Sequence, residues 1–168
     1  DNEKFTIGNM EVTVLHTPGH TNDSVSYLIG DSVFIGDTLF APDFGSARTD
    51  FPGGDAQSLY QSIHKLFELP DATRVFLCHD YMPAGRELEY VHSLEEQKQK
   101  NIHINETVTE QEFVARREAR DEKLGMPGLI IPSIQLNIRA GQLPPEEDNG
   151  VAYLKVPLNQ LGKPRKVD

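Results

Sequence analysis

The sequence has a single cysteine, no apolar run of membrane-spanning length, and fewer basic than acidic residues. Because Cys78 has no second cysteine to pair with, no disulfide can form inside the chain, which fits a reducing compartment. The 16 lysines and arginines against 26 aspartates and glutamates give a net charge of -10. Neither a nucleic acid nor an anionic membrane is therefore expected as the partner, since phosphate contacts need clustered cations. We expect a cytoplasmic protein, or a mitochondrial-matrix protein in a eukaryote.

The composition is that of a folded chain. Its 168 residues suit one domain with a buried core, and 38% hydrophobic with 25% charged residues is typical of globular proteins. The first residues, Asp1-Asn2-Glu3-Lys4, lack the apolar stretch of a signal peptide and lead directly into a strand pattern. We expect from this that the chain begins inside a larger fold.

Several segments have the pattern of β-strands. Residues 10–15 alternate between apolar and polar side chains, and residues 24–29 and 32–35 are joined by Gly30-Asp31, a hairpin signal. A buried strand is expected at 73–78 and a last one at 151–156, after which the end frays. Residues 41–54 have glycine and proline breaks without a period, so we expect a loop there.

Three helices are expected between or after these strands. The first is capped by Asp55 and has an apolar stripe through Leu59, Ile63 and Leu66. The second follows the capping box at 93–96, and the third runs from Thr109 to about Lys123. The charged residues of the third helix are expected to form a solvated face; they are Arg116, Arg117, Glu118, Arg120, Asp121 and Glu122. This order of elements favours layered α/β packing.

Three predicted strands lead into residues that can bind a metal. The strand at 10–15 leads into the turn that contains His20, the strand at 32–35 into Asp37, and the strand at 73–78 into His79. Strand ends that lie side by side in one sheet place such residues on a common edge. Imidazole and carboxylate suit zinc, iron and manganese, and two histidines with one carboxylate form the facial set of non-haem Fe(II) enzymes.

The same residues resemble those of a known family. The strings Thr-Pro-Gly-His-Thr at 17–21, Gly-Asp-Thr-Leu at 36–39 and His-Asp-Tyr at 79–81 are similar in order and spacing to the second half of the metallo-β-lactamase superfamily. The resemblance implies an α/β fold, the second half of an αββα sandwich, with the metal at the sheet edge. It implies that residues 1–140 are the C-terminal portion of such a domain and that residues 141–168 are an extension.

Within this superfamily the chain looks most like the persulfide dioxygenases, because of Arg48-Thr49-Asp50-Phe51 and the 79–81 string. The resemblance implies oxidation of glutathione persulfide to sulfite and glutathione on a single Fe(II). It implies that His20 and the catalytic Asp37 are two of three iron ligands, and that His79 is a metal-site residue, either at a second metal or behind the iron. Substrate-binding roles are implied for Arg48, Tyr81 and Thr21.

The chain departs from the family at two places. The signature His-x-His-x-Asp-His, which would supply the third iron ligand, does not occur in the 168 residues. We therefore expect this chain alone to be inactive. Related enzymes carry Asn-Pro-Arg where this chain has Asn101-Ile102-His103, so the resemblance supplies no second basic contact for glutathione there.

Two other functions are compatible with these residues. A hydroxyacylglutathione hydrolase would have the same fold but two metals, for which zinc is suitable, and a metal-activated water. Alternatively, the chain is a non-catalytic fragment that folds by association with its other half or with a second copy, and a homo-oligomer is expected. The remaining candidates have structural explanations: Cys78 as a buried strand residue, and His16, His64 and His92 as structural or exposed side chains.

Overall fold

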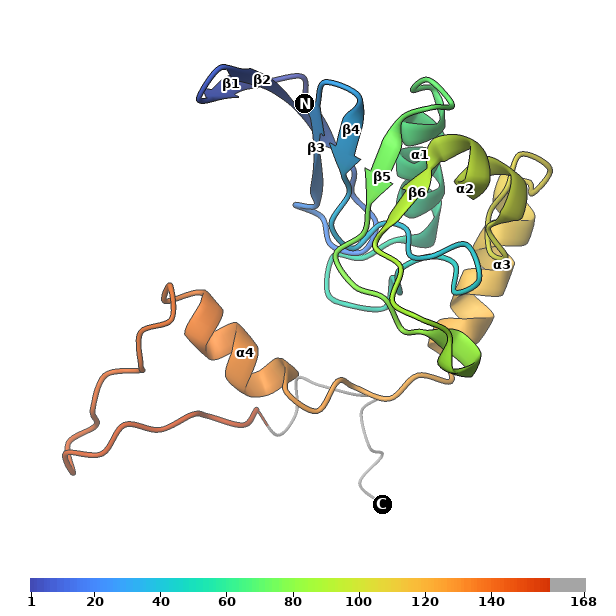
Figure 1. The fold of residues 1–168 in the computed structure, drawn as a ribbon. Coiled ribbons are helices and arrows are strands. Elements are labelled where there is room, and N and C mark those ends of the chain that lie inside the picture. The colour runs from blue at the N-terminus through green and yellow to red at the C-terminus, as the bar shows by residue number, and fades with distance from the viewer. Residues whose placement is uncertain (158–168) are drawn as a thin grey trace. The chain divides into compact units, whose positions relative to one another are not determined.

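The structure of the protein is a computed structural model that describes residues 1–157 and divides into two compact units, Asp1–Lys123 and Leu124–Asp168 (Figure 1). The domain boundary expected at residue 140 stays a prediction, because a division by contacts does not test how far a family domain extends. Within the described residues, no helix combines the length and the apolar character needed to cross a membrane.

The first unit contains a six-stranded sheet in which the strands lie in chain order. They are β1 (Lys4–Ile7), β2 (Met10–His16), β3 (Val25–Ile29), β4 (Ser32–Phe34), β5 (Arg74–Phe76) and β6 (Val91–Ser93). All neighbours pair antiparallel except β4 and β5, which are parallel. The strands predicted at 10–15, 24–29 and 32–35 are confirmed. The strand predicted at 73–78 ends earlier, at Phe76, and the sequence pattern did not predict β6.

Three helices accompany the sheet, and each begins where its capping residue predicts. Helix α1 (Ala56–Phe67) is capped by Asp55, whose side chain accepts a hydrogen bond from the Ser58 N–H. Helix α2 (Leu94–Lys100) is capped by Ser93, and α3 (Glu110–Asp121) begins with a complete capping box between Thr109 and Glu112. Such caps satisfy backbone N–H groups that have no partner within the helix.

The core lies between the sheet and these helices. Leu15, Val33 and Val75 face the helices from the sheet, and all three are buried. They pack in one cluster with the stripe of α1, with one residue of α2 and with one of α3; these are Leu59, Ile63, Leu66, Leu94 and Phe113. Burying each such side chain contributes roughly 1.5–3 kcal/mol. This one-sided α/β packing agrees with the predicted half of an αββα sandwich.

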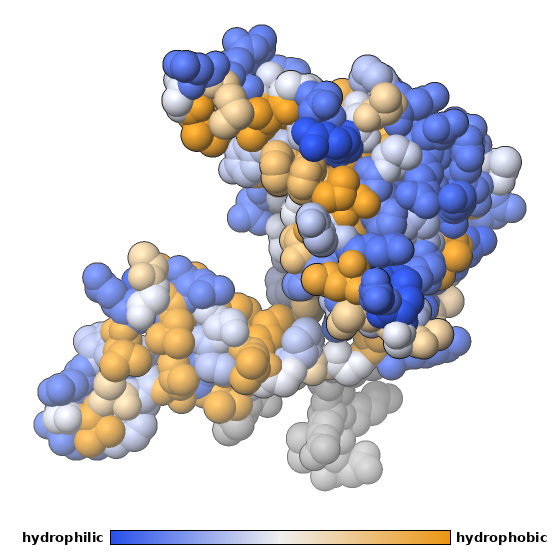
Figure 2. All heavy atoms as spheres, viewed as in Figure 1, coloured by the Kyte–Doolittle hydropathy of each residue, from blue (hydrophilic) through white to orange (hydrophobic). Residues whose placement is uncertain are grey.

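The other face of the sheet is apolar and open to solvent. Tyr27, Phe34 and Phe76 are neighbours on paired strands and therefore share this face. The rings of Phe34 and Phe76 stack at 4.7 Å, and Phe34 is 41% exposed. Figure 2 shows apolar side chains gathered over these N-terminal strands.

The described part of the second unit, up to residue 157, contains one helix, α4 (Ile130–Asn137), which the sequence analysis did not predict because of its proline-rich surroundings. Pro132 is tolerated in α4 because it lies in the first turn, where the backbone N–H groups have no partner within the helix. The strand predicted at 151–156 is wrong. Only an isolated bridge between Glu146 and Ala152 forms there, within the described part of the unit. The predicted fraying end falls on residues 158–168, outside the described residues.

Candidate metal centre

The structure brings the three predicted metal-site residues together. The Asp37 Oδ2 atom lies 4.0 Å from His20 Nε2, and Asp37 Oδ1 lies 2.8 Å from His79 Nε2. These residues follow β2, β4 and β5, so the expected convergence of three strand ends is present. That they ligate a metal stays a prediction. Asp37 is the shared member, with one carboxylate oxygen toward each histidine.

A glycine turn places His20 against helix α1. Gly19 has φ = 141°, and a Cβ there would lie 2.4 Å from the Cα of Leu59. Only glycine fits both the conformation and the close approach. The turn is held at two points, because Gly19 O accepts a hydrogen bond from Asp55 N–H at 2.9 Å and Pro18 O accepts one from the Ser62 hydroxyl at 2.6 Å.

The ring of His20 is oriented as a metal ligand needs. Its Nδ1 lies 2.7 Å from the carbonyl oxygen of Arg48. Since a carbonyl only accepts, Nδ1 must carry the proton, and neutral His20 then has its lone pair on Nε2, the atom that faces Asp37. Metal-binding histidines usually have their second nitrogen held in this way. The donor set therefore fits a divalent ion.

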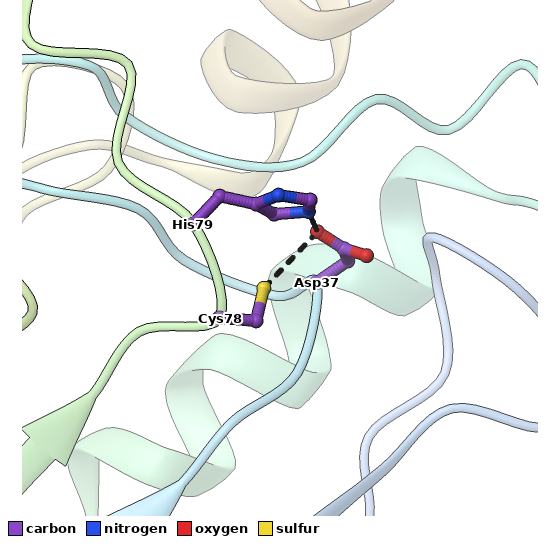
Figure 3. A group of neighbouring side chains, drawn as sticks. All are labelled: Asp37, Cys78 and His79. Atoms are coloured by element: carbon purple, nitrogen blue, oxygen red, sulfur yellow. Dashed lines mark hydrogen bonds and ion pairs between the residues drawn. The ribbon is translucent and has the colours of Figure 1, made fainter.

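Parallel pairing of β4 and β5 places Asp37 beside Cys78 and His79. In that register Phe34 lies opposite Phe76, so the residues three positions beyond each strand meet. Figure 3 shows the Asp37 carboxylate between the two side chains. Its Oδ1 accepts a hydrogen bond from the Cys78 thiol at 3.2 Å as well as the contact from His79.

The expectation that Cys78 is a buried strand residue is wrong. Because β5 ends at Phe76, Cys78 lies beyond the strand and is exposed. Its sulfur nevertheless sits in a partly desolvated place beside Asp37. Desolvation, and then the negative charge of Asp37, raise the pKa of the thiol to about 12. The sequence signal that could have found it is its position directly before a ligand candidate at a strand end.

Arg48 makes an ion pair with Asp50. Its guanidinium donates two hydrogen bonds to Asp50, of 2.6 and 2.7 Å, and lies over the Phe51 ring at 4.8 Å. The Arg48 guanidinium holds the pKa of the Asp50 carboxyl below its usual range. The substrate role of Arg48 stays a prediction, as does that of Thr21, whose hydroxyl donates to Asp23 at 2.7 Å.

Tyr81 belongs to an aromatic group beside the centre. Its ring stacks on Phe44 at 4.2 Å, contacts Phe40 edge-on at 5.3 Å and lies 5.8 Å from the His79 ring. Partial burial and, after it, the Asp37 charge raise the pKa of the phenol. Tyr81 is 51% exposed, so its ring, although stacked on Phe44, is accessible to a ligand at the site.

Two charged residues of α3 are part of the site's support rather than of a solvated face. Arg117 and Asp121 are 3% and 5% exposed and pair at 2.7 Å, so the expectation of a fully solvated face is wrong for them. Asp121 also accepts the Thr49 N–H at 2.8 Å, and Arg117 donates to Ser46 O at 2.9 Å. They lie four and eight residues after the buried Phe113, and this helical spacing was the missed signal.

His103 supports the same loop. It is buried, and its Nδ1 accepts the Ser46 N–H at 2.9 Å. Desolvation, with the charge of Arg117 next, lowers its pKa to about 4. A neutral, buried imidazole is not a basic contact for an anionic ligand, in agreement with the departure from Asn-Pro-Arg at this point.

Asp80 has a structural partner. Its side chain, 1% exposed, binds the Arg86 guanidinium at 2.6 and 2.8 Å, and Arg86 also binds Asp43. Arg86 is the largest cause of a pKa for Asp80 well below the usual range. This carboxylate therefore fixes the segment that follows His79 and, in this structure, does not contact the ring.

Comparisons with known proteins agree with this picture. A family model described as the metallo-beta-lactamase superfamily matches residues 1–79. Glyoxylase B2 of Dictyostelium discoideum is 52% identical over 162 residues, which is 96% of this chain and 56% of that protein. Hydroxyacylglutathione hydrolase of Shewanella halifaxensis is 43% identical over 86 residues, 50% of this chain and 32% of that protein. The chain thus spans about half the length of the first of these relatives, and half of the chain matches a third of the second.

Solved structures are similar as well. The crystal structure of ETHE1 from Myxococcus xanthus superposes with a TM-score of 0.74 at 39% identity, and the match covers 84% of this chain and 59% of that one. A di-iron-bound form of the protein TTHA1623 gives a TM-score of 0.50 at 29% identity over 62% of this chain and 46% of that one.

Proposed function

Because the family model and the solved structures support the metallo-beta-lactamase superfamily for this chain, we propose that the whole protein is a persulfide dioxygenase. In this reaction glutathione persulfide, O2 and water give glutathione, sulfite and two protons; the outer sulfur is oxidised and O2 is reduced. The superfamily is one of metal-dependent enzymes, and the structural similarity to ETHE1 supports this member of it.

The observation that carries the proposal is the orientation of His20. With Nδ1 held by the Arg48 carbonyl, its Nε2 and the Asp37 carboxylate offer two of the three ligands that a facial iron site needs. Bound Fe(II) would supply adjacent positions for the persulfide sulfur and O2. The same hydrogen bond ties a ligand to the residue proposed to bind substrate, so metal and substrate positions are set by one backbone segment.

The chain's own side chains would hold the glutathione part of the substrate. A guanidinium fork suits a carboxylate, and Arg48 would share its charge between Asp50 and the glutathione carboxylate. The Tyr81 ring, stacked on Phe44, would cover the peptide. Phe40 contacts the His79 ring edge-on at 5.8 Å, and Phe51 contacts the His20 ring edge-on at 5.1 Å.

The test measures sulfite formation and O2 uptake from glutathione persulfide with the iron-loaded whole protein. We expect His20→Ala to abolish both, whereas His79→Ala keeps most of the activity because His79 lies outside a one-iron ligand set. Absence of O2 uptake with iron bound would reject the proposal.

A glutathione thioester hydrolase is the second candidate. The approach of His79 to Asp37 favours it, because a second metal next to the first would use these two groups. Two metals per chain, thioester hydrolysis, and loss of that hydrolysis in His79→Ala would establish this function in place of the dioxygenase.

A third candidate is not an enzyme: the chain would be a non-catalytic fragment that folds by association. The open apolar sheet face around Phe34 favours it, since such a face is stabilised by being covered. Size-exclusion chromatography and metal analysis of the 168-residue chain separate the cases. A monomer that binds metal would exclude the hypothesis that the chain is a non-catalytic fragment.

A further inference from the structure

A single peptide group connects His20 to a buried carboxylate on α3. The carbonyl oxygen of Arg48 accepts the hydrogen bond of His20 Nδ1 at 2.7 Å. The N–H of the same peptide group belongs to Thr49 and donates to Asp121 Oδ2 at 2.8 Å. The peptide is trans, so its C=O and N–H groups point in opposite directions. The two hydrogen bonds therefore form one chain, in which a planar amide lies between the imidazole and the carboxylate.

This chain of hydrogen bonds runs through a buried region, where a charge acts strongly. Thr49 and Asp121 are both buried, and His20 is part-buried. A carboxylate that accepts an N–H polarises the amide and places more negative charge on its carbonyl oxygen, and successive hydrogen bonds strengthen one another in this way. The Arg48 carbonyl is therefore a stronger acceptor than an ordinary peptide carbonyl, and it holds the Nδ1 proton of His20 more tightly.

Arg117 opposes this effect. Its guanidinium is buried and donates to the other carboxylate oxygen, Asp121 Oδ1, at 2.7 Å. The ion pair satisfies the buried carboxylate and withdraws part of its negative charge from the Thr49 N–H. The two charged groups thus act on the amide with opposite sign: the carboxylate strengthens the hydrogen bond of His20, and the guanidinium weakens it.

We propose that Asp121 is a positioning residue for His20 and acts through the peptide between residues 48 and 49. Arg117 sets the strength of this action. The proton stays on Nδ1 and no covalent bond breaks, but Nε2 gains electron density and becomes a better metal ligand, as in histidines whose second nitrogen faces a carboxylate directly. The inference rests on the metal role of His20 in the proposed function and does not depend on the substrate.

The first measurement is the proton NMR signal of His20 Nδ1–H in the metal-free 168-residue chain, at about pH 8, above the ordinary pKa of histidine. A stronger hydrogen bond moves such a signal to lower field. Arg117→Met with Asp121→Asn keeps an oxygen that can accept the Thr49 N–H but removes both charges, so we expect a move to higher field. This double variant leaves no buried charge unpaired and should fold. Arg117→Met alone removes only the opposing charge and should move the signal to lower field.

Two observations separate the effect of charge from damage to the fold. A disturbed hydrogen bond would move the signal in the same direction in both variants, whereas the proposal requires opposite directions. Thr49→Val removes the hydroxyl that donates to Asp121 at 3.1 Å but keeps the N–H, so it should leave the signal in place. A signal that does not move in the double variant, or that moves in the same direction in both variants, would overturn the proposal.

The second measurement is the affinity of the whole protein for Co²⁺, by competition with a chelator. Arg117→Met with Asp121→Asn should bind the ion about tenfold more weakly, because the groups that support a ligand histidine typically contribute at least that much. Glu118→Ala, on the exposed side of α3, should bind as tightly as the unmodified protein. Equal affinities in the double variant and the unmodified protein would overturn the proposal. If the protein shows these effects but takes up no O2 with iron bound, the dioxygenase is rejected and the role of Asp121 is retained.

Discussion

The two walls of the candidate metal centre differ in burial. One, the buried wall, consists of His20, Arg48 and Thr49; the first two side chains are each 17% exposed and Thr49 is 7% exposed. The other, the exposed wall, consists of Cys78, His79 and Tyr81, and the His79 side chain is 50% exposed. Both walls present ligand atoms to the same carboxylate.

The difference shows how a ligand can be positioned in two ways. On the buried wall, His20 is set by a backbone carbonyl whose own segment is bonded to helix α3 through Asp121. On the exposed wall, His79 is set mainly by strand register and by Asp37 itself. We infer that the buried wall keeps its geometry without a metal, whereas the exposed wall takes its final position when an ion binds.

Asp121→Ala should have the largest effect, because it removes the support of the buried wall. The substitution leaves the Arg117 charge buried without its carboxylate and the Thr49 N–H without its acceptor. Removing one partner of a buried ion pair costs about 3–5 kcal/mol. The free energy of unfolding, measured with urea, should fall by that amount.

Two companion variants test that reason. Glu118→Ala lies on the exposed side of the same helix, and should change stability by no more than about 0.5 kcal/mol. Replacing both partners with apolar residues, Arg117→Met with Asp121→Leu, should recover much of the loss. Equal losses in Asp121→Ala and Glu118→Ala would show that the ion pair does not support the wall.

Acid should weaken the buried wall through His103. Its folded pKa of about 4 lies below the ordinary 6.5, so the unfolded chain takes up a proton first as the pH falls. The stabilisation is complete above pH 6.5 and is lost between 6.5 and 4, by about 3 kcal/mol. Urea unfolding at several pH values should show this slope.

His103→Gln is the control, because the amide can accept the Ser46 N–H and does not titrate. It should flatten the pH dependence over this interval while keeping most of the stability at neutral pH. An unchanged slope in this variant would assign the acid sensitivity to other groups.

Gly19→Ala should come next in size. The new Cβ would lie 2.4 Å from the backbone of Leu59, in a conformation of positive φ, so the turn before His20 would have to move away from α1. We expect a loss of about 2–3 kcal/mol and a weaker Fe(II) affinity. Gly30→Ala shares a positive φ but meets no atom within 4 Å, so it should cost only about 1 kcal/mol and leave the metal affinity unchanged.

The sequence predicted the features that depend on local signals and missed those that depend on long-range contacts. The strand and helix starts came from local signals, alternation and caps, and the structure confirms them for β2, β3, α1, α2 and α3. The meeting of three strand ends was also predictable, since a strand leads to each of His20, Asp37 and His79. The strand and helix starts depend on neighbouring residues in the chain, which the sequence shows directly.

The support of the buried wall was not predictable, because it comes from a contact between two residues that lie 72 positions apart in the chain, Thr49 and Asp121. In the sequence, Asp121 looks like any other charge on a polar helix. Cys78 was misjudged for a related reason. The end of β5 is set by its pairing with β4 and β6, so apolar residues 77 and 78 lie outside the strand although their pattern continues it.

The smallest expected effects, those of His20→Ala and His79→Ala on stability, test the comparison of the two walls most directly. In the metal-free chain, His20→Ala removes a part-buried hydrogen bond to Arg48 O and an edge contact with Phe51, and should cost about 1–2 kcal/mol. His79→Ala removes a half-exposed ring and an exposed pair with Asp37, and should cost about 0.5 kcal/mol or less. The measurement is the free energy of unfolding of both variants in urea, without metal. Equal losses of stability would mean that burial does not distinguish the two walls. Both histidines would then take their final positions only when an ion binds.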